Sequence, residues 1–152
     1  RTCICSQKQV SQYLSRISGP MLDRFDLHVE VAPVEFENIS SREKEESSAS
    51  IRERVQAARE IQTARYKGTD ITCNARITSD ILHEVCPMTD EAVAMLKVVF
   101  EKMGLSARAY DRILKVSRTI ADMSGKEVIG KSDIAQAVQY RSLDRKYWNG
   151  GK

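Results

Sequence analysis

The chain has 152 residues, about the size of one domain, and 41% of them are apolar while 30% are charged. These proportions allow a packed core and exclude wholesale disorder. The net charge of +3 does not establish a nucleic-acid partner, because a mixed solvated surface explains it equally well. No apolar run is long enough to span a membrane, so we expect a soluble, cytoplasmic protein with no membrane partner. Because the chain begins with Arg1 rather than methionine, we expect a fragment of a longer protein.

The N-terminal part of the chain predicts a helix, a turn and a strand. Residues 6–9 read as a capping box that opens a helix, and residues 18–20, Ser-Gly-Pro, end it. Residues 21–25 are long enough for a single turn. Apolar and polar side chains then alternate over residues 27–31, the period of a strand. A lone strand is unstable in water, so we expect it to join a sheet whose other strands lie outside this chain or in a second copy.

A polar connection and one long helix follow. The stretch 38–50 is rich in Ser and Glu and predicts a flexible connection. Residues 50–53 form a second capping box, after which apolar residues repeat at helical spacing over 51–66, with Gly68 as the stop. The narrow apolar stripe predicts an exposed connecting helix. Its arginines are expected on a solvated face, with contact to DNA as the alternative; they are Arg52, Arg59 and Arg65.

The remainder of the chain predicts a small bundle of four short helices. Predicted caps alternate with predicted stops along it: Ser79, Pro87, Thr89, Gly104, Ser106, Gly125 and the pair Ser132-Asp133. Of the cysteines, Cys73 is expected in a loop and Cys86 buried in a helix, and both are expected to stay reduced. Tyr13 and Tyr110 are expected to fill helix–helix seams. We predict that residues 71–142 fold on their own.

Catalytic motifs are scarce. The sequence has neither a Gly-x-x-x-x-Gly-Lys-Ser/Thr phosphate loop nor a dinucleotide-binding Gly-x-Gly-x-x-Gly. It has no His-Glu-x-x-His pair, and no nucleophile stands beside an obvious base. The residues alone therefore predict only a helical module with an incomplete sheet.

Three segments, taken together and in order, resemble the magnesium-chelatase-like AAA+ ATPases. They are residues 17–31 (ISGPMLDRFDLHVEV), 105–116 (LSARAYDRILKV) and 137–144 (AVQYRSLD). The resemblance implies a mainly α chain: a C-terminal helical lid bundle, preceded by a long linker helix and by the last strand and helix piece of the α/β AAA+ core. The implied boundaries are 1–34 for the end of the core, 35–70 for the linker, 71–145 for the lid and 146–152 for the tail.

The resemblance also implies roles for two arginines. Arg24 matches the arginine finger, which reaches the γ-phosphate of ATP bound by a neighbouring subunit and stabilises the charge of the transition state. Without the resemblance, Arg24 would be expected to pair with Asp23 or Asp26 on a turn. Arg108 matches sensor 2, a lid arginine that contacts ATP phosphates in its own subunit or in its neighbour. Without the resemblance, Arg108 would be expected to face solvent.

The implied whole protein is an Mg·ATP-dependent ring, expected to be hexameric, that drives DNA remodelling or branch migration. This chain alone should not hydrolyse ATP, because it lacks the phosphate loop. Cys3 and Cys5 resemble half of a cysteine-rich element of the competence-type members, which implies zinc, although two cysteines cannot complete a four-ligand site. The alternatives are a non-catalytic DNA- or protein-binding helical module, or a subunit of a metal chelatase.

Overall fold

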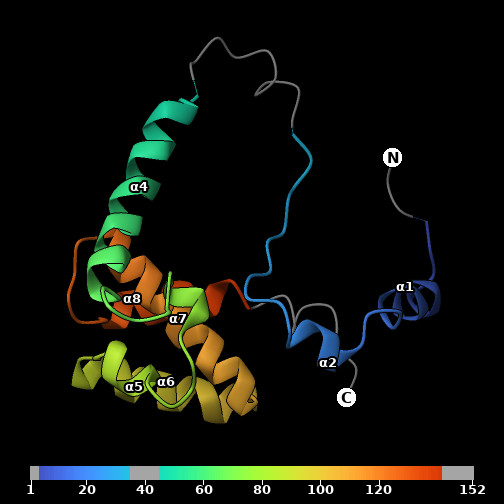
Figure 1. The fold of residues 1–152 in the computed structure, drawn as a ribbon. Coiled ribbons are helices and arrows are strands. Elements are labelled where there is room, and N and C mark those ends of the chain that lie inside the picture. Colours follow the sequence, from blue (N-terminus) through green and yellow to red (C-terminus); the bar gives the residue numbers. More distant parts are fainter. Residues whose placement is uncertain (1–3, 35–44, 142–152) are drawn as a thin grey trace.

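The computed structural model describes residues 4–34 and 45–141, and within these two ranges the chain is mainly helical (Figure 1). The mainly α fold expected from the sequence is therefore confirmed. Over the same ranges there is no β-strand, and a single isolated bridge joins Met88 to Ile129. No helix among the described residues has the length and apolar composition needed to cross a membrane.

The helices occur in the following order along the chain. They are α1 (Gln7–Leu14), α2 (Gly19–Leu22), α4 (Ser48–Arg65), the 3-10 turn η1 (Asn74–Arg76), α5 (Leu82–Val85), α6 (Asp90–Met103), α7 (Ala107–Met123) and α8 (Lys131–Gln139). In Figure 1, α5 to α8 form a bundle, α4 rises from it, and α1 lies apart from it beyond α2.

Local capping signals place most of the helix ends. The Ser6 capping box is formed, and the Thr89 and Ser106 hydroxyls accept N–H bonds at the starts of α6 and α7. Gly104 adopts the left-handed conformation that ends α6, with φ of 57°. Asp133 near the start of α8 accepts the backbone N–H of residue 130 at 2.8 Å.

Three predicted starts were wrong. The last helix begins at Lys131 rather than at the pair Ser132-Asp133, because residue 130 is its N-cap. The long helix begins one turn earlier than the predicted capping box, because the hydroxyl of Ser47 accepts the Ser50 N–H. Ser79 does not cap α5; its hydroxyl instead donates to the Asp111 carboxylate on α7 at 2.5 Å. A hydroxyl that can bond either a local amide or a distant carboxylate is not assigned by sequence spacing alone.

The hydrophobic core lies inside the bundle and extends to the end of α4. Its buried residues are Tyr66, Ile77, Leu82, Cys86, Ala92, Leu96, Ile113, Leu114, Ala121, Ile129, Ile134 and Ala137. Tyr110 packs against this cluster, as expected, and Cys86 is buried, as expected. Because these side chains come from every helix of the bundle and from the residue after α4, the packed unit begins before residue 71.

The long helix is only partly an exposed connector. Ala58 and Gln62 on its second half are buried, whereas Ile51 and Val55 on its first half remain 44% and 43% exposed. All four lie on one helical stripe, at spacings of three or four residues. The C-terminal half of α4 therefore packs on the bundle, and its N-terminal half projects beyond it (Figure 1).

The N-terminal part departs from the sequence predictions. The helix α1 buries none of its residues, and Tyr13 is 70% exposed, so the prediction that Tyr13 fills a helix seam was wrong. Residues 27–31 do not form the predicted strand. Within the described residues they have no partner strand, and an extended segment without a neighbour cannot make a ladder of hydrogen bonds.

Candidate functional site

Arg24 lies just beyond α2, where its backbone N–H donates to the Met21 carbonyl at 3.0 Å. Its side chain is exposed, and Nη1 donates to the Pro20 carbonyl at 3.4 Å. The sequence left open that Arg24 pairs with Asp23 or Asp26, but neither pair is found in the part of the chain that the structure describes. The guanidinium of Arg24 is therefore presented to solvent on a short turn.

The two aspartates beside Arg24 are engaged by residues of the bundle instead. Asp23 accepts a hydrogen bond from the Ser106 hydroxyl at 3.0 Å, and its carboxylate lies 3.5 Å from Nη2 of Arg141. Asp26 forms an ion pair with Arg112 of α7. Both carboxylates that could neutralise Arg24 thus bind residues of the helical bundle.

Arg141 is the buried centre of this contact. It is 1% exposed, and its Nη1 donates to the Phe25 carbonyl at 2.7 Å. Nearby, the His28 N–H donates to the Tyr140 carbonyl at 2.7 Å. The segment of residues 22–28 is therefore held by the start of α7 and by the end of α8. Arg141 was not predicted as a functional residue, and its only signal in the sequence is its place in the family-like segment 137–144.

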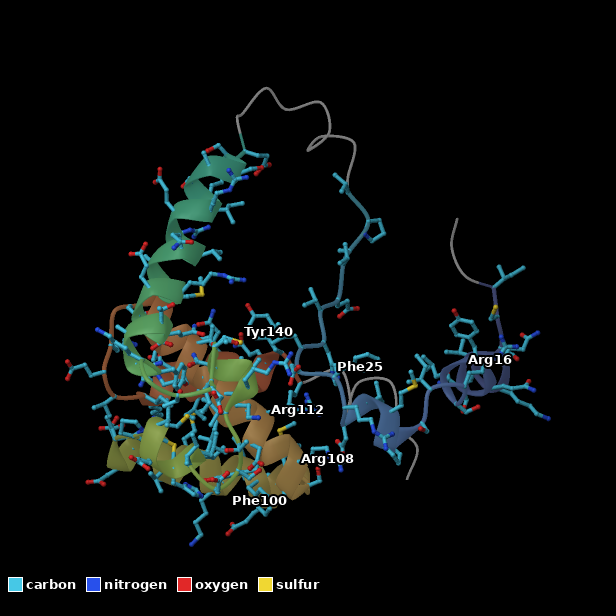
Figure 2. The ribbon with its side chains drawn as sticks, in the orientation of Figure 1. Arg16, Phe25, Phe100, Arg108, Arg112 and Tyr140 are labelled. Atoms are coloured by element: carbon cyan, nitrogen blue, oxygen red, sulfur yellow. The ribbon has the colours of Figure 1, made fainter. Side chains whose placement is uncertain are left out.

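Arg108 occupies the first turn of α7 and is exposed, on the side of the helix that faces the α2 segment (Figure 2). Arg112 and Lys115 follow at spacings of four and three residues, which places the three cations on one face. They line a shallow cleft of about 390 Å³ together with Asp26, Ala75, Ser79, Ala107 and Asp111.

The electrostatics of this cleft favour an anion. A helix N-terminus carries partial positive charge, so Arg108 in the first turn of α7 is unfavourably placed unless an anion binds there. Arg112 is paired with Asp26. Asp111 is held by the Ser79 hydroxyl. Arg108 and Lys115 form no ion pair within the described residues, which leaves their charges to the cleft.

A buried polar network behind the cleft was not predicted from the sequence. The Asp122 carboxylate is fully buried and accepts bonds from Arg65, Asn74 and Arg118. Burial alone would raise the pKa of Asp122, but the hydrogen bonds from Arg65 and Asn74 and the charge of Arg118 hold it below its ordinary value. The same bond to Asp122 raises the pKa of Arg65.

This network changes the reading of the α4 arginines. Arg65 does not lie on the solvated face that the sequence predicts, because its guanidinium is bound to Asp122. Arg54 pairs with Glu46 on the surface at 2.7 Å. Arg52 and Arg59 remain exposed, in agreement with a solvated face.

The cysteine pair does not form a metal site within the described residues. Cys5 is exposed, and Cys3 lies outside the residues that the structure describes. The described ranges contain no cluster of three or more metal-ligating side chains. A structural zinc takes four ligands, so at least two would have to come from elsewhere.

Comparison with known proteins gives the family. The sequence model described as "Magnesium chelatase, subunit ChlI C-terminal" matches residues 45–141. The chain belongs to the magnesium chelatase family. A second model of this family, "Magnesium chelatase, subunit ChlI", matches residues 1–39. The boundary between the two matches falls in the connection that precedes α4.

Relatives of the family match almost the whole chain. The chain is 41% identical over 141 residues to the competence protein ComM of Haemophilus influenzae. The match covers 92% of this chain and 27% of ComM. It is 40% identical over 143 residues to the Escherichia coli protein YifB, and the match covers 93% of this chain and 27% of YifB. The chain thus spans about a quarter of the length of the curated relatives it matches.

Proposed function

We propose that this chain is the C-terminal part of a longer ATPase subunit that assembles into a ring. In this proposal Arg24 is the arginine finger for ATP bound by a neighbouring subunit, and Arg108 is the sensor 2 arginine of the lid. The family membership supports an AAA+ context, and the length of the relatives supports a longer parent protein.

The observation that carries the proposal is the exposure of Arg24 and Arg108. Both guanidinium groups are exposed, and the carboxylates beside Arg24 are bound to lid residues rather than to Arg24. An arginine kept out of internal ion pairs retains its full charge for an anion. A guanidinium supplied to a γ-phosphoryl group stabilises the negative charge that spreads over its oxygens, and such a contact typically contributes roughly 10³–10⁵ in rate.

The residues present fit only part of an Mg·ATP site. Arg108 and Lys115 fit the phosphate oxygens, because both line the cleft at the start of α7. Mg²⁺, when bound, would neutralise charge on the β- and γ-phosphates. The chain contains no phosphate-binding loop, so in this proposal ATP is cradled by another part of the parent and this chain alone does not hydrolyse it.

We further propose that the ATPase remodels DNA, through translocation or branch migration, in a ring expected to be hexameric. The similarity to a relative named as a competence protein supports DNA work over metal insertion into a porphyrin. Zinc bound by Cys3 and Cys5 with cysteines from elsewhere in the parent remains part of this proposal, and Cys5 is exposed as such a ligand would need.

The test is ATP hydrolysis by the parent protein and its Arg24→Ala and Arg108→Ala variants, with and without DNA. We expect each variant to lose roughly two orders of magnitude or more in kcat while the ring stays assembled. Arg16→Ala is the matched control, because Arg16 is also an exposed arginine and its guanidinium lies over the Tyr13 ring, outside the cleft at the start of α7. An unchanged rate in Arg24→Ala with the ring intact would refute the finger assignment.

DNA stimulation separates the proposal from its rival, a non-catalytic DNA-binding module. The proposed motor should hydrolyse ATP faster when DNA is present. A non-catalytic module should show steep salt dependence of DNA binding by this chain alone, and its parent protein should not hydrolyse ATP with or without DNA.

A further inference from the structure

The turn that carries Arg24 is clamped by one buried side chain. Nη1 of Arg141 donates to the Phe25 carbonyl at 2.7 Å, and Nη2 lies 3.5 Å from the Asp23 carboxylate. One guanidinium therefore contacts the residue before Arg24 and the residue after it. A planar guanidinium with several donors is suited to such a double contact, whereas a lysine ammonium is a compact point charge.

The burial of Arg141 favours one position of the turn. Arg141 is 1% exposed, and a buried cation is costly unless its charge and donors are matched. The Asp23 carboxylate supplies the charge, and the Phe25 carbonyl supplies an acceptor. If the turn left the bundle, Arg141 would lose these two contacts, so the contacts favour the native position of the turn.

The Asp23 carboxylate also links the turn to the start of α7, beside the cleft lined by Arg108 and Lys115. Asp23 also accepts the Ser106 hydroxyl at 3.0 Å, and Ser106 is the N-cap of α7, two residues before Arg108. Figure 2 places Phe25, Arg108 and Arg112 on the same side of the bundle. Asp23 thus joins the turn of Arg24 to the start of the helix that carries Arg108.

We propose that Asp23 and Arg141 are positioning residues, which hold Arg24 on the lid so that Arg24 and Arg108 of one chain move as a unit. The effect of this clamp on catalysis rests on the proposed function, whereas the contacts of Asp23 and Arg141 do not. A lid movement at one nucleotide site would then carry the arginine finger that serves the neighbouring site. The two sites are coupled because two arginines share one rigid support.

The clamp is tested first on this 152-residue chain by amide hydrogen exchange. We expect Asp23→Ala and Arg141→Lys to speed exchange in residues 21–28 by about tenfold, because lost hydrogen bonds let the turn open locally. Thr89→Ala is the matched control, since it removes an N-cap bond from α6 and touches nothing on the turn. Exchange in the core of α7 reports whether each variant remains folded.

The Asp23→Ala variant keeps this test decisive if Arg141→Lys fails to fold. Asp23 is 35% exposed and lies outside the hydrophobic core, so its replacement removes no side chain from that core. Unchanged exchange over residues 21–28 in folded Asp23→Ala would overturn the proposal. Faster exchange in that segment, with no such change in Thr89→Ala, would support it.

The catalytic consequence is tested in the parent ATPase by combining Asp23→Ala with Arg24→Ala. If Asp23 acts through Arg24, Asp23→Ala lowers kcat by about tenfold with little change in KM, and the double variant is no slower than Arg24→Ala alone. Fully additive losses would mean that Asp23 acts independently and would overturn the positioning role. A normal rate in Arg24→Ala would instead refute the proposed function, and hydrogen exchange would still decide the clamp.

Discussion

Arg65, the last residue of α4, donates Nη1 to Oδ2 of Asp122 at 2.9 Å and Nη2 to the other carboxylate oxygen. This paired contact joins residues 57 positions apart in the sequence. Oδ1 of the same carboxylate also accepts Nε of Arg118 at 3.0 Å, and Arg118 donates to the backbone carbonyls of Glu127 and Lys126 after α7. Asp122 therefore holds α4, α7 and the following loop together.

Replacing Asp122 should destabilise the protein strongly. Asp122→Asn leaves Arg118 buried without a compensating charge, and removing one partner of a buried ion pair costs about 3–5 kcal/mol. Urea unfolding followed by circular dichroism measures the loss. The control is Glu46→Gln, which breaks the exposed pair with Arg54 and should cost less than about 1 kcal/mol. Equal effects of the two substitutions would contradict this account.

The lowered pKa of Asp122 predicts how stability depends on acid. In the unfolded chain an aspartate has a pKa of about 3.9, and the pKa of Asp122 in the folded protein lies lower. At pH values between these two pKa values, the unfolded state therefore binds more protons than the folded state. The stabilisation from Asp122 is complete above the unfolded pKa and is lost as the pH falls through the folded pKa. Urea midpoints measured from pH 6 to pH 2 should fall less steeply in Asp122→Asn than in the unmodified protein.

The packed unit should be more stable when it includes α4. The sequence predicted that residues 71–142 fold on their own, and this stays a prediction. A fragment 71–141 lacks Tyr66 of the core and the Arg65 partner of Asp122, so we expect it to unfold at lower urea concentration than a fragment 45–141. Equal midpoints for the two fragments would show that α4 adds nothing to the bundle.

Cys86 should resist thiol reagents while the protein is folded. Burial raises the pKa of Cys86 to about 11, so at pH 8 only about 0.1% of this thiol is the reactive thiolate, and access is also blocked. In a chain whose other three cysteines are serine, alkylation at pH 8 should proceed only on unfolding. A matched chain that retains only Cys5, which is exposed, should react at once. Rapid labelling of folded Cys86 would argue against the buried core position.

Some features of the fold were readable because they depend on neighbours in the sequence. The caps at Ser6, Thr89 and Ser106 bond amides three residues away, and Gly104 ends α6 through its own left-handed conformation. The apolar periodicity likewise predicted the mainly helical fold. The family-like segments indicated Arg24 and Arg108, and the structure leaves both side chains exposed.

The partners of the charged residues were decided only by the tertiary structure. Spacing offered Asp23 and Asp26 as partners for Arg24, yet they bind Arg141 and Arg112 from the far end of the chain. Spacing also placed Arg65 on a solvated face, although it lies against Asp122. The physical reason is that a carboxylate binds whichever donor folding brings within about 3 Å with the least loss of solvation, and sequence distance does not enter that choice. The sequence by itself thus determined the mainly helical fold and the caps at Ser6, Thr89 and Ser106, and only packing determined which charges are held and which remain exposed.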